Sequence, residues 1–440
     1  MNFYVFNTLL QTNPAEASPV ALPVKGRFLR QRYQVLAGLL LGVVLPAILQ
    51  LGWSSHQGSS GYFYNSCLAS LLAVGLSLLV QRKIAALPGR YGLTVVNASL
   101  CVGYGLTIAF FFALDLVYAK TQLALSLLLT LGTLCLFAKL SSKNRKVRFL
   151  LASDHAAPSI RKSLGVEWIR AATPEMAALY PNIPIVFDRL RTELSADWKR
   201  FLGEEAIAGR LIYSRDHFEE SLLGKVRSPD YVADHLAHLA IDSIYARLKT
   251  LFDRCGAVFI LALLSPLFLI TAVLIRLETS GPALFRQTRI GYRGRAFTVF
   301  KFRSMVSKPG ESDAVTSDMT KSEDNRITRL GHFLRRSRID ELPQLINVAR
   351  GEMSWIGPRP ETSSLSELYS KNIANYRLRH MVRPGITGWA QVRQGHVTSI
   401  HDVAEKLEYD LYYVKYFSFW LDILILLKTI DVVVTGRGAK

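Results

Sequence analysis

Four long apolar segments occupy the first third of the chain. They run approximately over residues 34–53, 63–80, 92–118 and 122–139. Each is close to the length of about 20 residues that a helix needs to cross the hydrocarbon core of a bilayer. A basic start such as this one is also typical of signal peptides, but the first apolar segment is long and lacks a small-residue cleavage pattern. The pattern therefore predicts four transmembrane helices.

The connections between these segments alternate in their content of Lys and Arg. Residues 54–61 have none, and the third connection has only Lys120. The second connection and the segment after the fourth helix are basic: Arg82, Lys83 and Arg90, then Lys139, Lys143, Arg145, Lys146 and Arg148. Because basic connections stay on the cytoplasmic side, both ends of the chain are predicted to be cytoplasmic. Asp115, near the end of the third segment, is interpreted as a snorkelling or helix-packing residue, with a functional intramembrane acid as the alternative.

Residues 141–247 have a different pattern. Short apolar stretches at 183–187, which is strand-like, and at 206–213 alternate with helical patterns at 193–202 and 231–248. This alternation predicts a small cytoplasmic α/β module. The sequence has neither GxGxxG nor a P-loop there, so we assign it no nucleotide and expect a regulatory or spacing role.

A fifth apolar segment, at about 255–276, contains Ser265-Pro266 at its centre. A proline inside a helix removes a backbone hydrogen bond and bends the helix, and Ser265 can satisfy a freed carbonyl. Both flanks are basic, with Arg254 before the segment and Arg276 after it. The pattern therefore favours a re-entrant helical hairpin with both ends cytoplasmic. The alternative, a fifth span, would place the rest of the chain outside the cell.

Composition adds a strong positive charge. The 440 residues include 53 Lys and Arg against 34 Asp and Glu, a net charge of +19, and mean hydropathy is +0.20. This balance suits phosphorylated substrates or anionic lipid and excludes a disordered or disulfide-framework protein. Nucleic acid is not an expected partner, because no recognition motif accompanies the charge. The four cysteines show no close pair and are interpreted as buried thiols: Cys67, Cys101, Cys135 and Cys255.

Candidate chemistry concentrates around the adjacent acids Asp340 and Glu341. Five arginines precede them: Arg326, Arg329, Arg335, Arg336 and Arg338. Neighbours on a helix point about 100° apart, so the two carboxylates can have separate functions. One can attack a phosphorus atom while the other helps to hold a divalent metal. The alternative is that both are ordinary acids at a helix N-terminus, paired with the arginines.

Arg359 lies between Pro358 and Pro360. The two proline rings restrict the backbone, so this guanidinium is a pre-placed donor for phosphate oxygens. Other basic and polar residues beside Gly and Pro turns are candidates for binding a polyphosphate at a membrane surface. The predicted substrate-binding residues are Arg286, Lys301, Arg303, Arg338, Pro358, Arg383, Thr387 and Gln391.

Residues 248–438 resemble the bacterial sugar transferases, the monotopic polyprenyl-phosphate phosphoglycosyl transferases. The resemblance rests on Lys249 with Asp253, on Ser265-Pro266, and on FRQTRIG, KFRSM, IDELPQL, GEMSWIGPRPE, RPGITGWAQV and EYDLYYV in this order. The four spans and the middle module are similar to the large subgroup that loads hexose-1-phosphate onto undecaprenyl phosphate for capsule, exopolysaccharide or O-antigen synthesis. Thr250 departs from the family, which often has Arg there, and so does Lys440, where an aromatic residue is common.

The resemblance implies a two-step transfer. Asp340 would attack the β-phosphorus of a UDP-sugar, expected to be UDP-glucose or UDP-galactose, and release UMP. Undecaprenyl phosphate would then attack the aspartyl intermediate. Glu341 would hold Mg²⁺, or Mn²⁺ as an alternative, while Arg359 would bind a phosphate and Arg335 would support the charge around Asp340. Two other readings stay open: an N-acetylated or diamino sugar as the substrate, and a non-catalytic scaffold for polysaccharide assembly.

The sequence thus predicts a protein of the bacterial inner membrane, of mixed α and α/β class. Its predicted parts are a cytoplasmic segment (1–32), a four-helix transmembrane bundle (33–140), a cytoplasmic α/β module (141–247), and a mainly helical cytoplasmic catalytic domain (248–440) with a re-entrant hairpin. By resemblance, Lys249 and Asp253 anchor the hairpin at the membrane interface. The implied partners are a UDP-sugar, undecaprenyl phosphate, anionic lipid, downstream glycosyltransferases and a second copy in a homodimer.

Overall fold

The computed structural model describes residues 31–53, 60–85, 93–143, 147–152, 166–187, 195–226, 244–306, 326–395 and 399–435. The chain divides into two compact units, Met1–Gly224 and Lys225–Lys440, and each is described by itself.

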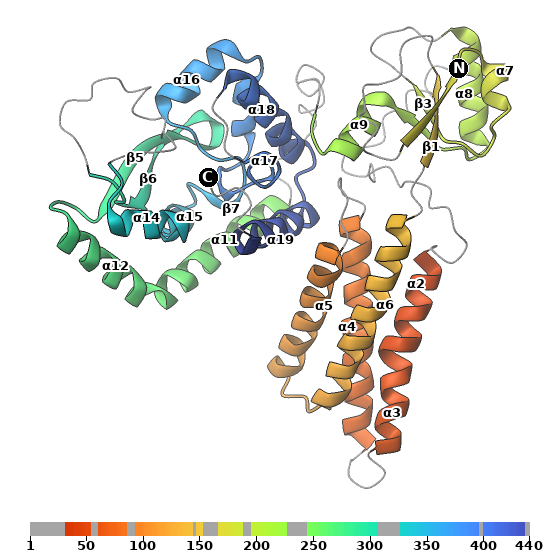
Figure 1. Ribbon diagram of the computed structural model, residues 1–440, viewed down its shortest axis with the longest axis horizontal. Coiled ribbons are helices and arrows are strands. Elements are labelled where there is room, and N and C mark those ends of the chain that lie inside the picture. The colour runs from red at the N-terminus through yellow and green to blue at the C-terminus, as the bar shows by residue number, and fades with distance from the viewer. Residues whose placement is uncertain are drawn as a thin grey trace. The chain divides into compact units, whose positions relative to one another are not determined.

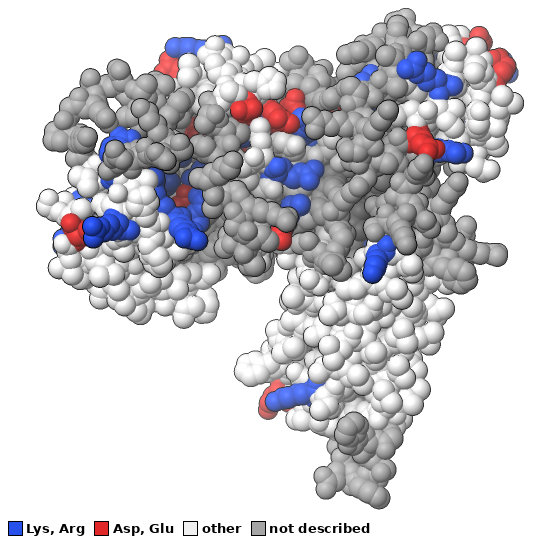
Figure 2. All heavy atoms as spheres, viewed as in Figure 1, with Lys and Arg blue, Asp and Glu red and all other residues white. Residues whose placement is uncertain are grey.

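Four apolar helices open the first unit (Figure 1). The first consists of α2 (Gln31–Leu39), a π-helical turn η2 (Leu40–Val44) and α3 (Leu45–Trp53); the others are α4 (Ser60–Ala85), α5 (Leu93–Ala113) and α6 (Lys120–Lys143). All four are long and apolar enough to cross a membrane. In the space-filling view this part is almost free of charged side chains except near its ends (Figure 2). The predicted four spans are therefore confirmed.

Small residues and hydroxyls join these helices. A Cβ on Gly42, in the π-helical turn, would collide with the Thr130 side chain. The Gly42 carbonyl accepts a hydrogen bond of 2.5 Å from Ser126 Oγ. The Tyr104 hydroxyl lies 2.8 Å from Ser126 Oγ. Close approach at small residues and hydroxyl hydrogen bonds are typical of helix contacts in lipid.

Two expectations about single residues in apolar segments were wrong. Asp115 lies outside the third span, because α5 ends at Ala113 and Asp115 occupies an exposed turn with φ 52°. Cys101 and Cys255 are exposed, not buried. Both lie on apolar helices, so their thiols face the side where lipid would cover the protein.

The first unit continues with a parallel sheet. Its strands are β1 (Val147–Ala152), β2 (Val166–Ala171), β3 (Ile185–Phe187) and β4 (Ile212–Ser214), in the order β2-β1-β3-β4. Successive side chains of a strand point to opposite faces. Leu150 and Ala152 of β1 therefore pack with α7 (Pro174–Ala178) and α8 (Ala196–Ile207), whereas Phe149 and Leu151 pack with α9 (Arg215–Leu223). The predicted α/β module is confirmed.

Details of this module differ from the prediction. The stretch 206–213 is only partly a strand, because α8 runs to Ile207 and β4 begins at Ile212. Most of the helical pattern predicted at 231–248 lies outside the described residues, as do most of residues 1–32.

The second unit begins with a bent pair of apolar helices, α11 (Ile244–Leu263) and α12 (Ser265–Glu278), which meet at 63°. Pro266 lies in the first turn of α12, and Ser265 Oγ donates a 2.8 Å hydrogen bond to the Ala262 carbonyl. The predicted break is therefore confirmed at the predicted residues. Both helices of the pair contact the same domain: Asp253 in α11 accepts a hydrogen bond from Ser354, and Glu278 at the end of α12 accepts one from the Leu330 backbone N–H. This arrangement supports a hairpin that leaves the membrane on the side it entered.

Replacing Pro266 with Ala is expected to favour a straight span, because alanine restores the backbone N–H and removes the ring that breaks the helix. Part of the population would then place Arg276 outside the cell. Labelling a single cysteine at position 276 with a membrane-impermeant reagent in intact cells measures this fraction. Ser265→Ala, which leaves the proline in place, is the matched control. If Pro266→Ala retained the wild-type labelling pattern, the proline would not be what sets the turn.

The rest of the second unit rests on the bent pair (Figure 1). The antiparallel strands β5 (Leu284–Ile290) and β6 (Ala296–Phe302) are joined by η4 (Tyr292–Gly294), and the parallel strands β7 (Ser354–Ile356) and β8 (Gly385–Thr387) form a second pair. The helices are α14 (Arg329–Arg336), η5 (Ile339–Glu341), α15 (Gln344–Arg350), α16 (Ser363–Asn372), η6 (Tyr376–Met381), α17 (Trp389–Arg393), α18 (Ile400–Lys415) and α19 (Phe419–Thr435). This confirms a mainly helical C-terminal domain. Asp422 of α19 is buried, as expected for a core helix rather than a span.

Candidate active site

A short turn presents the two candidate acids. Thr328 caps the N-terminus of α14, because its hydroxyl accepts a hydrogen bond from the Gly331 N–H. After α14, Arg338 adopts a left-handed conformation with φ 59°. Non-glycine residues adopt this region at a cost, often at functional sites. The chain then enters η5, where Asp340 and Glu341 are both buried, with less than a tenth of each residue exposed to solvent.

Glu341 contacts cationic side chains from distant parts of the chain. Its Oε1 accepts a 2.6 Å hydrogen bond from Arg359 Nη2, lies 3.4 Å from Lys301 Nζ, and lies 3.7 Å from Arg338 Nη1. The two short contacts come from β6 and from the loop after β7, not from neighbouring helix positions. The reading of Asp340 and Glu341 as ordinary helix acids paired with local arginines is therefore not favoured. The structure brings Asp340, Glu341, Lys301 and Arg359 together.

The two acids have opposite pKa shifts. Burial raises the pKa of Asp340, and the neighbouring Glu341 charge adds to this effect, against opposing contributions from Lys301, Arg335 and Arg338. Burial also acts to raise the pKa of Glu341, but Arg359 and Lys301 outweigh it and hold that pKa well below its usual range. Burial lowers the pKa of Lys301 to about 8, despite the opposing attraction of Glu341. Pairs of acids whose environments separate their pKa values are typical of active sites.

These shifts predict a bell-shaped pH dependence of kcat/KM, which reports groups of the free enzyme. Activity should fall on the acidic side as Asp340 becomes protonated, at a pH above the usual range for an aspartate. On the basic side it should fall near pH 8, because Lys301, with a pKa of about 8, loses the charge that would attract a phosphate. Lys301→Arg should move the basic limb to higher pH, since a guanidinium stays protonated. The reaction rate at low substrate concentration measures both limbs; an unchanged basic limb in this variant would assign that limb to another group.

The backbone around Arg359 is held at every carbonyl from Pro358 to Glu361. The Gly385 N–H donates to the Pro358 carbonyl at 3.0 Å, and the Ile290 N–H donates to the Glu361 carbonyl at 3.0 Å. Between them, Arg379 Nη2 donates to the Arg359 carbonyl at 2.8 Å, and Arg289 Nη1 donates to the Pro360 carbonyl at 2.5 Å. Two prolines and four external donors therefore fix the residue whose guanidinium reaches Glu341.

A buried layer of charge lies behind this loop, and sequence reasoning missed it. Arg379 Nη2 lies 2.8 Å from Asp410 Oδ2, and each of these side chains is only 2% exposed. Lys406 Nζ lies 2.7 Å from Glu361 Oε1. Asp410 lies within the EYDLYYV motif and Glu361 ends GEMSWIGPRPE, so the motifs marked these positions without showing their partners. The layer neutralises buried charge and fixes the backbone of Arg359 from behind.

The other predicted site residues have diverse positions. Arg335 is half-buried and acts on Asp340 through its charge, whereas Arg338 and Arg286 are exposed, the latter 5.8 Å from the centre of the Phe300 ring. Pro358 lines a small cavity beside Arg359. Four predicted binding residues contact backbone or hydroxyl groups of the protein itself: Arg303 (Thr279 and Ser280 carbonyls), Arg383 (Gly351 carbonyl), Thr387 (Thr429 hydroxyl) and Gln391 (Ile386 carbonyl). For these residues a role in substrate binding stays a prediction.

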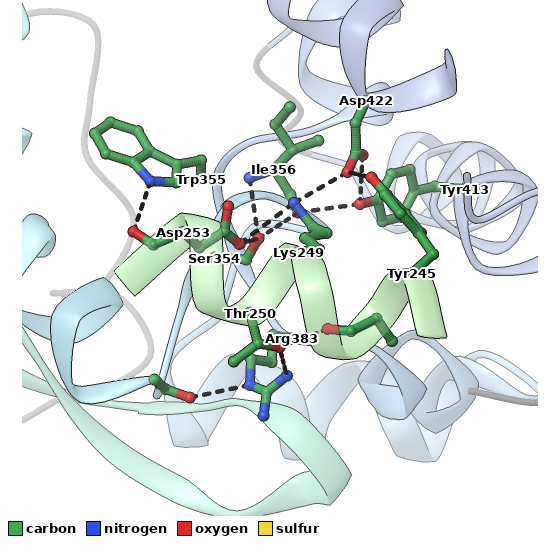
Figure 3. Close-up of polar contacts among 12 residues, drawn as sticks. Tyr245, Lys249, Thr250, Asp253, Ser354, Trp355, Ile356, Arg383, Tyr413 and Asp422 are labelled. Carbon is green, nitrogen blue, oxygen red and sulfur yellow. Dashed lines mark hydrogen bonds and ion pairs between the residues drawn. The ribbon is translucent and has the colours of Figure 1, made fainter. Parts of the chain in front are cut away.

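Lys249 and Asp253 lie in a polar network between the hairpin and the domain (Figure 3). Lys249 Nζ lies 3.0 Å from Asp422 Oδ2 and 3.4 Å from Asp253 Oδ2. Asp422 also accepts hydrogen bonds from the Tyr245 and Tyr413 hydroxyls. The start of α11 is therefore joined to α18 and α19, which fits the expected anchoring function.

The acids suit a divalent metal that also contacts the substrate. No group of three or more His, Cys, Asp and Glu side chains that could hold a metal occurs in the described ranges. Mg²⁺, however, is usually held by one or two carboxylates together with substrate phosphates and water. Asp340 Oδ1 is buried and has no hydrogen-bond partner among the residues that the structure describes. The contacts of Glu341 given above all involve Oε1, so the donor set fits a metal completed by phosphate oxygens.

Comparison with known proteins finds a matching family and similar relatives named for sugar-phosphate transfer or exopolysaccharide production. Residues 244–436 match the bacterial sugar transferase family. The chain is 34% identical over 403 residues, 92% of its length and 94% of the relative's, to the UDP-N-acetylgalactosamine-undecaprenyl-phosphate N-acetylgalactosaminephosphotransferase of Aeromonas hydrophila. It is 44% identical over 185 residues, 42% of its length and 39% of the relative's, to the UDP-glucose:undecaprenyl-phosphate glucose-1-phosphate transferase of Escherichia coli (strain K12). It is also 40% identical over 197 residues, 43% of its length and 98% of the relative's, to the exopolysaccharide production protein PSS of Rhizobium leguminosarum bv. phaseoli.

Proposed function

The chain belongs to the bacterial sugar transferase family and is an undecaprenyl-phosphate sugar phosphotransferase, and we propose that it acts through a covalent intermediate on Asp340. The observation that carries this proposal is the buried Asp340 beside a Glu341 that Arg359 and Lys301 neutralise. A carboxylate with no partner on one oxygen, next to fixed cations, suits attack on a phosphorus atom.

In the first step an Asp340 oxygen bonds to the β-phosphorus of the UDP-sugar. The bond from that phosphorus to the bridging oxygen breaks, and UMP leaves with the electron pair. In the second step an oxygen of undecaprenyl phosphate bonds to the same phosphorus, and the Asp340 carboxylate leaves. Lys301 and Arg359 offset the negative charge of the phosphates in both steps. Exopolysaccharide, capsule or O-antigen assembly would consume the lipid-linked product.

Mg²⁺, or Mn²⁺ in its place, is the proposed cofactor. Glu341 would hold it beside the substrate phosphates. The ion would neutralise charge on the diphosphate.

For the donor we favour UDP-N-acetylgalactosamine over the UDP-glucose or UDP-galactose that the sequence led us to expect. The relative named for UDP-N-acetylgalactosamine matches 92% of this chain, including the four spans and the α/β module. The E. coli relative named for UDP-glucose matches only 42% of it. We further propose that both chain ends and the catalytic domain are cytoplasmic, where UDP-sugars are made, on the basis of the basic connections and of the bent helix pair.

The test is UMP release by the purified protein with Mg²⁺ and a panel of UDP-sugars, with and without undecaprenyl phosphate. Turnover with one donor that depends on the lipid supports the reaction and names the sugar. A stoichiometric burst of UMP without the lipid supports the covalent intermediate. A folded protein that releases no UMP from any donor would favour the scaffold function instead.

A further inference from the structure

The second unit contains a cavity apart from the residues that surround Asp340 and Glu341. Its volume is about 310 Å³, close to the lower end of the usual range for small-molecule sites, and it lies beside the start of α11. Helix α11 contributes Arg247, Lys249, Thr250 and Asp253 to its wall. The facing wall contains Tyr292, Ser354, Val382, Arg383 and Phe417. Asp340 and Glu341 are not among the lining residues.

The charge of this wall is positive. Lys249 is neutralised by Asp253 and Asp422. Arg247 and Arg383 also line the cavity, and neither forms an ion pair with a carboxylate in the parts of the chain that the structure describes. Two cations therefore remain for a ligand, which suits an anion.

Arg383 is held in a fixed orientation. Its Nε donates to the Gly351 carbonyl at 3.1 Å, and its Nη1 donates to Thr250 Oγ1 at 2.8 Å (Figure 3). The guanidinium also lies 5.2 Å from the centre of the Tyr292 ring. Its Nη2 has no acceptor among the described residues. A planar guanidinium held at two nitrogens, with the third available, is a pre-placed donor for phosphate.

The surroundings of the cavity are typical of a membrane interface. Phe417 in its wall lies 5.2 Å, centre to centre, from the Tyr245 ring, and Tyr245 lies 6.4 Å from Phe419, which is 52% exposed. Aromatic rings are enriched at the level of lipid headgroups. The apolar surface of the hairpin also begins here, with exposed Leu248 and Phe252 on α11. These aromatic and apolar surroundings suit a ligand that is the headgroup of a membrane lipid.

The cavity lies next to the donor site but is distinct from it. Val382 lines this cavity and also the small cavity that contains Pro358, Arg359 and Pro360. We propose that the larger cavity, with Arg247 and Arg383 as its phosphate ligands, binds the phosphate headgroup of a membrane lipid. Undecaprenyl phosphate and an anionic phospholipid share this chemistry. The inference uses the transfer reaction but is independent of the sugar and of the Asp340 intermediate.

The experiment measures KM separately for each substrate in vesicles of phosphatidylcholine. Arg247→Gln and Arg383→Gln are each expected to raise KM for undecaprenyl phosphate by about tenfold, as for loss of one charged hydrogen bond. KM for the UDP-sugar should stay within about twofold, because the donor phosphates bind elsewhere. Arg377→Gln removes the charge of an exposed arginine outside the cavity and is the matched control. Arg247 is exposed, so its variant tests the proposal even where loss of Arg383 impairs folding.

A second arm repeats the assay with phosphatidylglycerol added to the vesicles. If KM for undecaprenyl phosphate is higher in the two variants than in the wild type when phosphatidylglycerol is absent, the acceptor lipid is the occupant. If phosphatidylglycerol changes the rate of the wild type but not of the two variants, a phospholipid is the occupant. If neither effect occurs, or if only KM for the UDP-sugar changes, the inference is overturned.

Failure of this inference differs from failure of the proposed mechanism. A burst of UMP in the absence of acceptor tests the intermediate on Asp340 and should persist in Arg247→Gln. A wild type without the burst would contradict the mechanism while leaving the KM comparison intact. Variants with a normal burst, a normal KM for undecaprenyl phosphate and the wild-type response to phosphatidylglycerol would contradict the lipid site alone.

Discussion

Asp340→Asn is expected to lower the transfer of sugar-1-phosphate to undecaprenyl phosphate by at least about 10³-fold. The amide has nearly the shape of the carboxylate but cannot form the acyl phosphate. Asp340 is only 9% exposed, and its Oδ1 has no partner within the described ranges, so the substitution breaks no hydrogen bond of that oxygen. The variant should therefore insert and fold normally. UMP release, the amount of protein in the membrane fraction and Tm in detergent measure these three properties.

Two further variants separate the nucleophile from its surroundings. Glu341→Gln should also reduce turnover strongly, because it removes the charge that Arg359 and Lys301 balance, yet it leaves Asp340 in place. Only Asp340→Asn should abolish the acceptor-independent burst of UMP. Glu367→Gln, at an exposed pair with Lys371, is the matched control and should be fully active. Full activity of Asp340→Asn would show that another group is the nucleophile.

Sequence reasoning worked best for features that extend over many residues, such as the long apolar segments. Each span is an apolar stretch near the thickness of a bilayer, and the proline at 266 marks the bend without any knowledge of neighbours. It failed at Asp115 because hydropathy continues past the last helical residue of α5: Leu114, Leu116 and Val117 are apolar but lie in the connection to α6. The end of a helix depends on local hydrogen bonds that an average over many residues does not resolve.

The sequence named candidate site residues but not the contacts between them. The motifs placed Asp340, Glu341 and Arg359, but nothing in the sequence shows that Arg359 and Lys301 share one oxygen of Glu341. Arg303 illustrates the opposite case. Its position in KFRSM suggested phosphate binding, whereas its hydrogen bonds given above go to Thr279 and Ser280 at the end of the hairpin. Contacts between distant segments follow from tertiary packing, which has no local pattern.

The Arg379–Asp410 pair is the largest such omission, and it leads to the second strong prediction. Arg379→Met would leave Asp410 buried and without its cation, and it would remove the donor to the Arg359 carbonyl. Breaking a buried ion pair on one side costs about 3–5 kcal/mol of folding free energy. We therefore expect a strong decrease in Tm. Lys371→Met, at an exposed pair, should cost at most about 1 kcal/mol and is the control.

A double variant distinguishes stability from catalysis. In Arg379→Met with Asp410→Leu no charge of the pair stays buried, so most of the lost stability should return. The Arg359 carbonyl would still lack its donor, and the Arg359 guanidinium would hold Glu341 less firmly. The pKa of Glu341 should then rise toward that of Asp340, so protonation of both acids should make the acidic limb of kcat/KM steeper than in the wild type even though Tm has recovered. A double variant with both wild-type Tm and a wild-type pH profile would show that Arg379 acts on stability alone, because a residue that positions Arg359 must alter the ionisation of the carboxylate that Arg359 contacts.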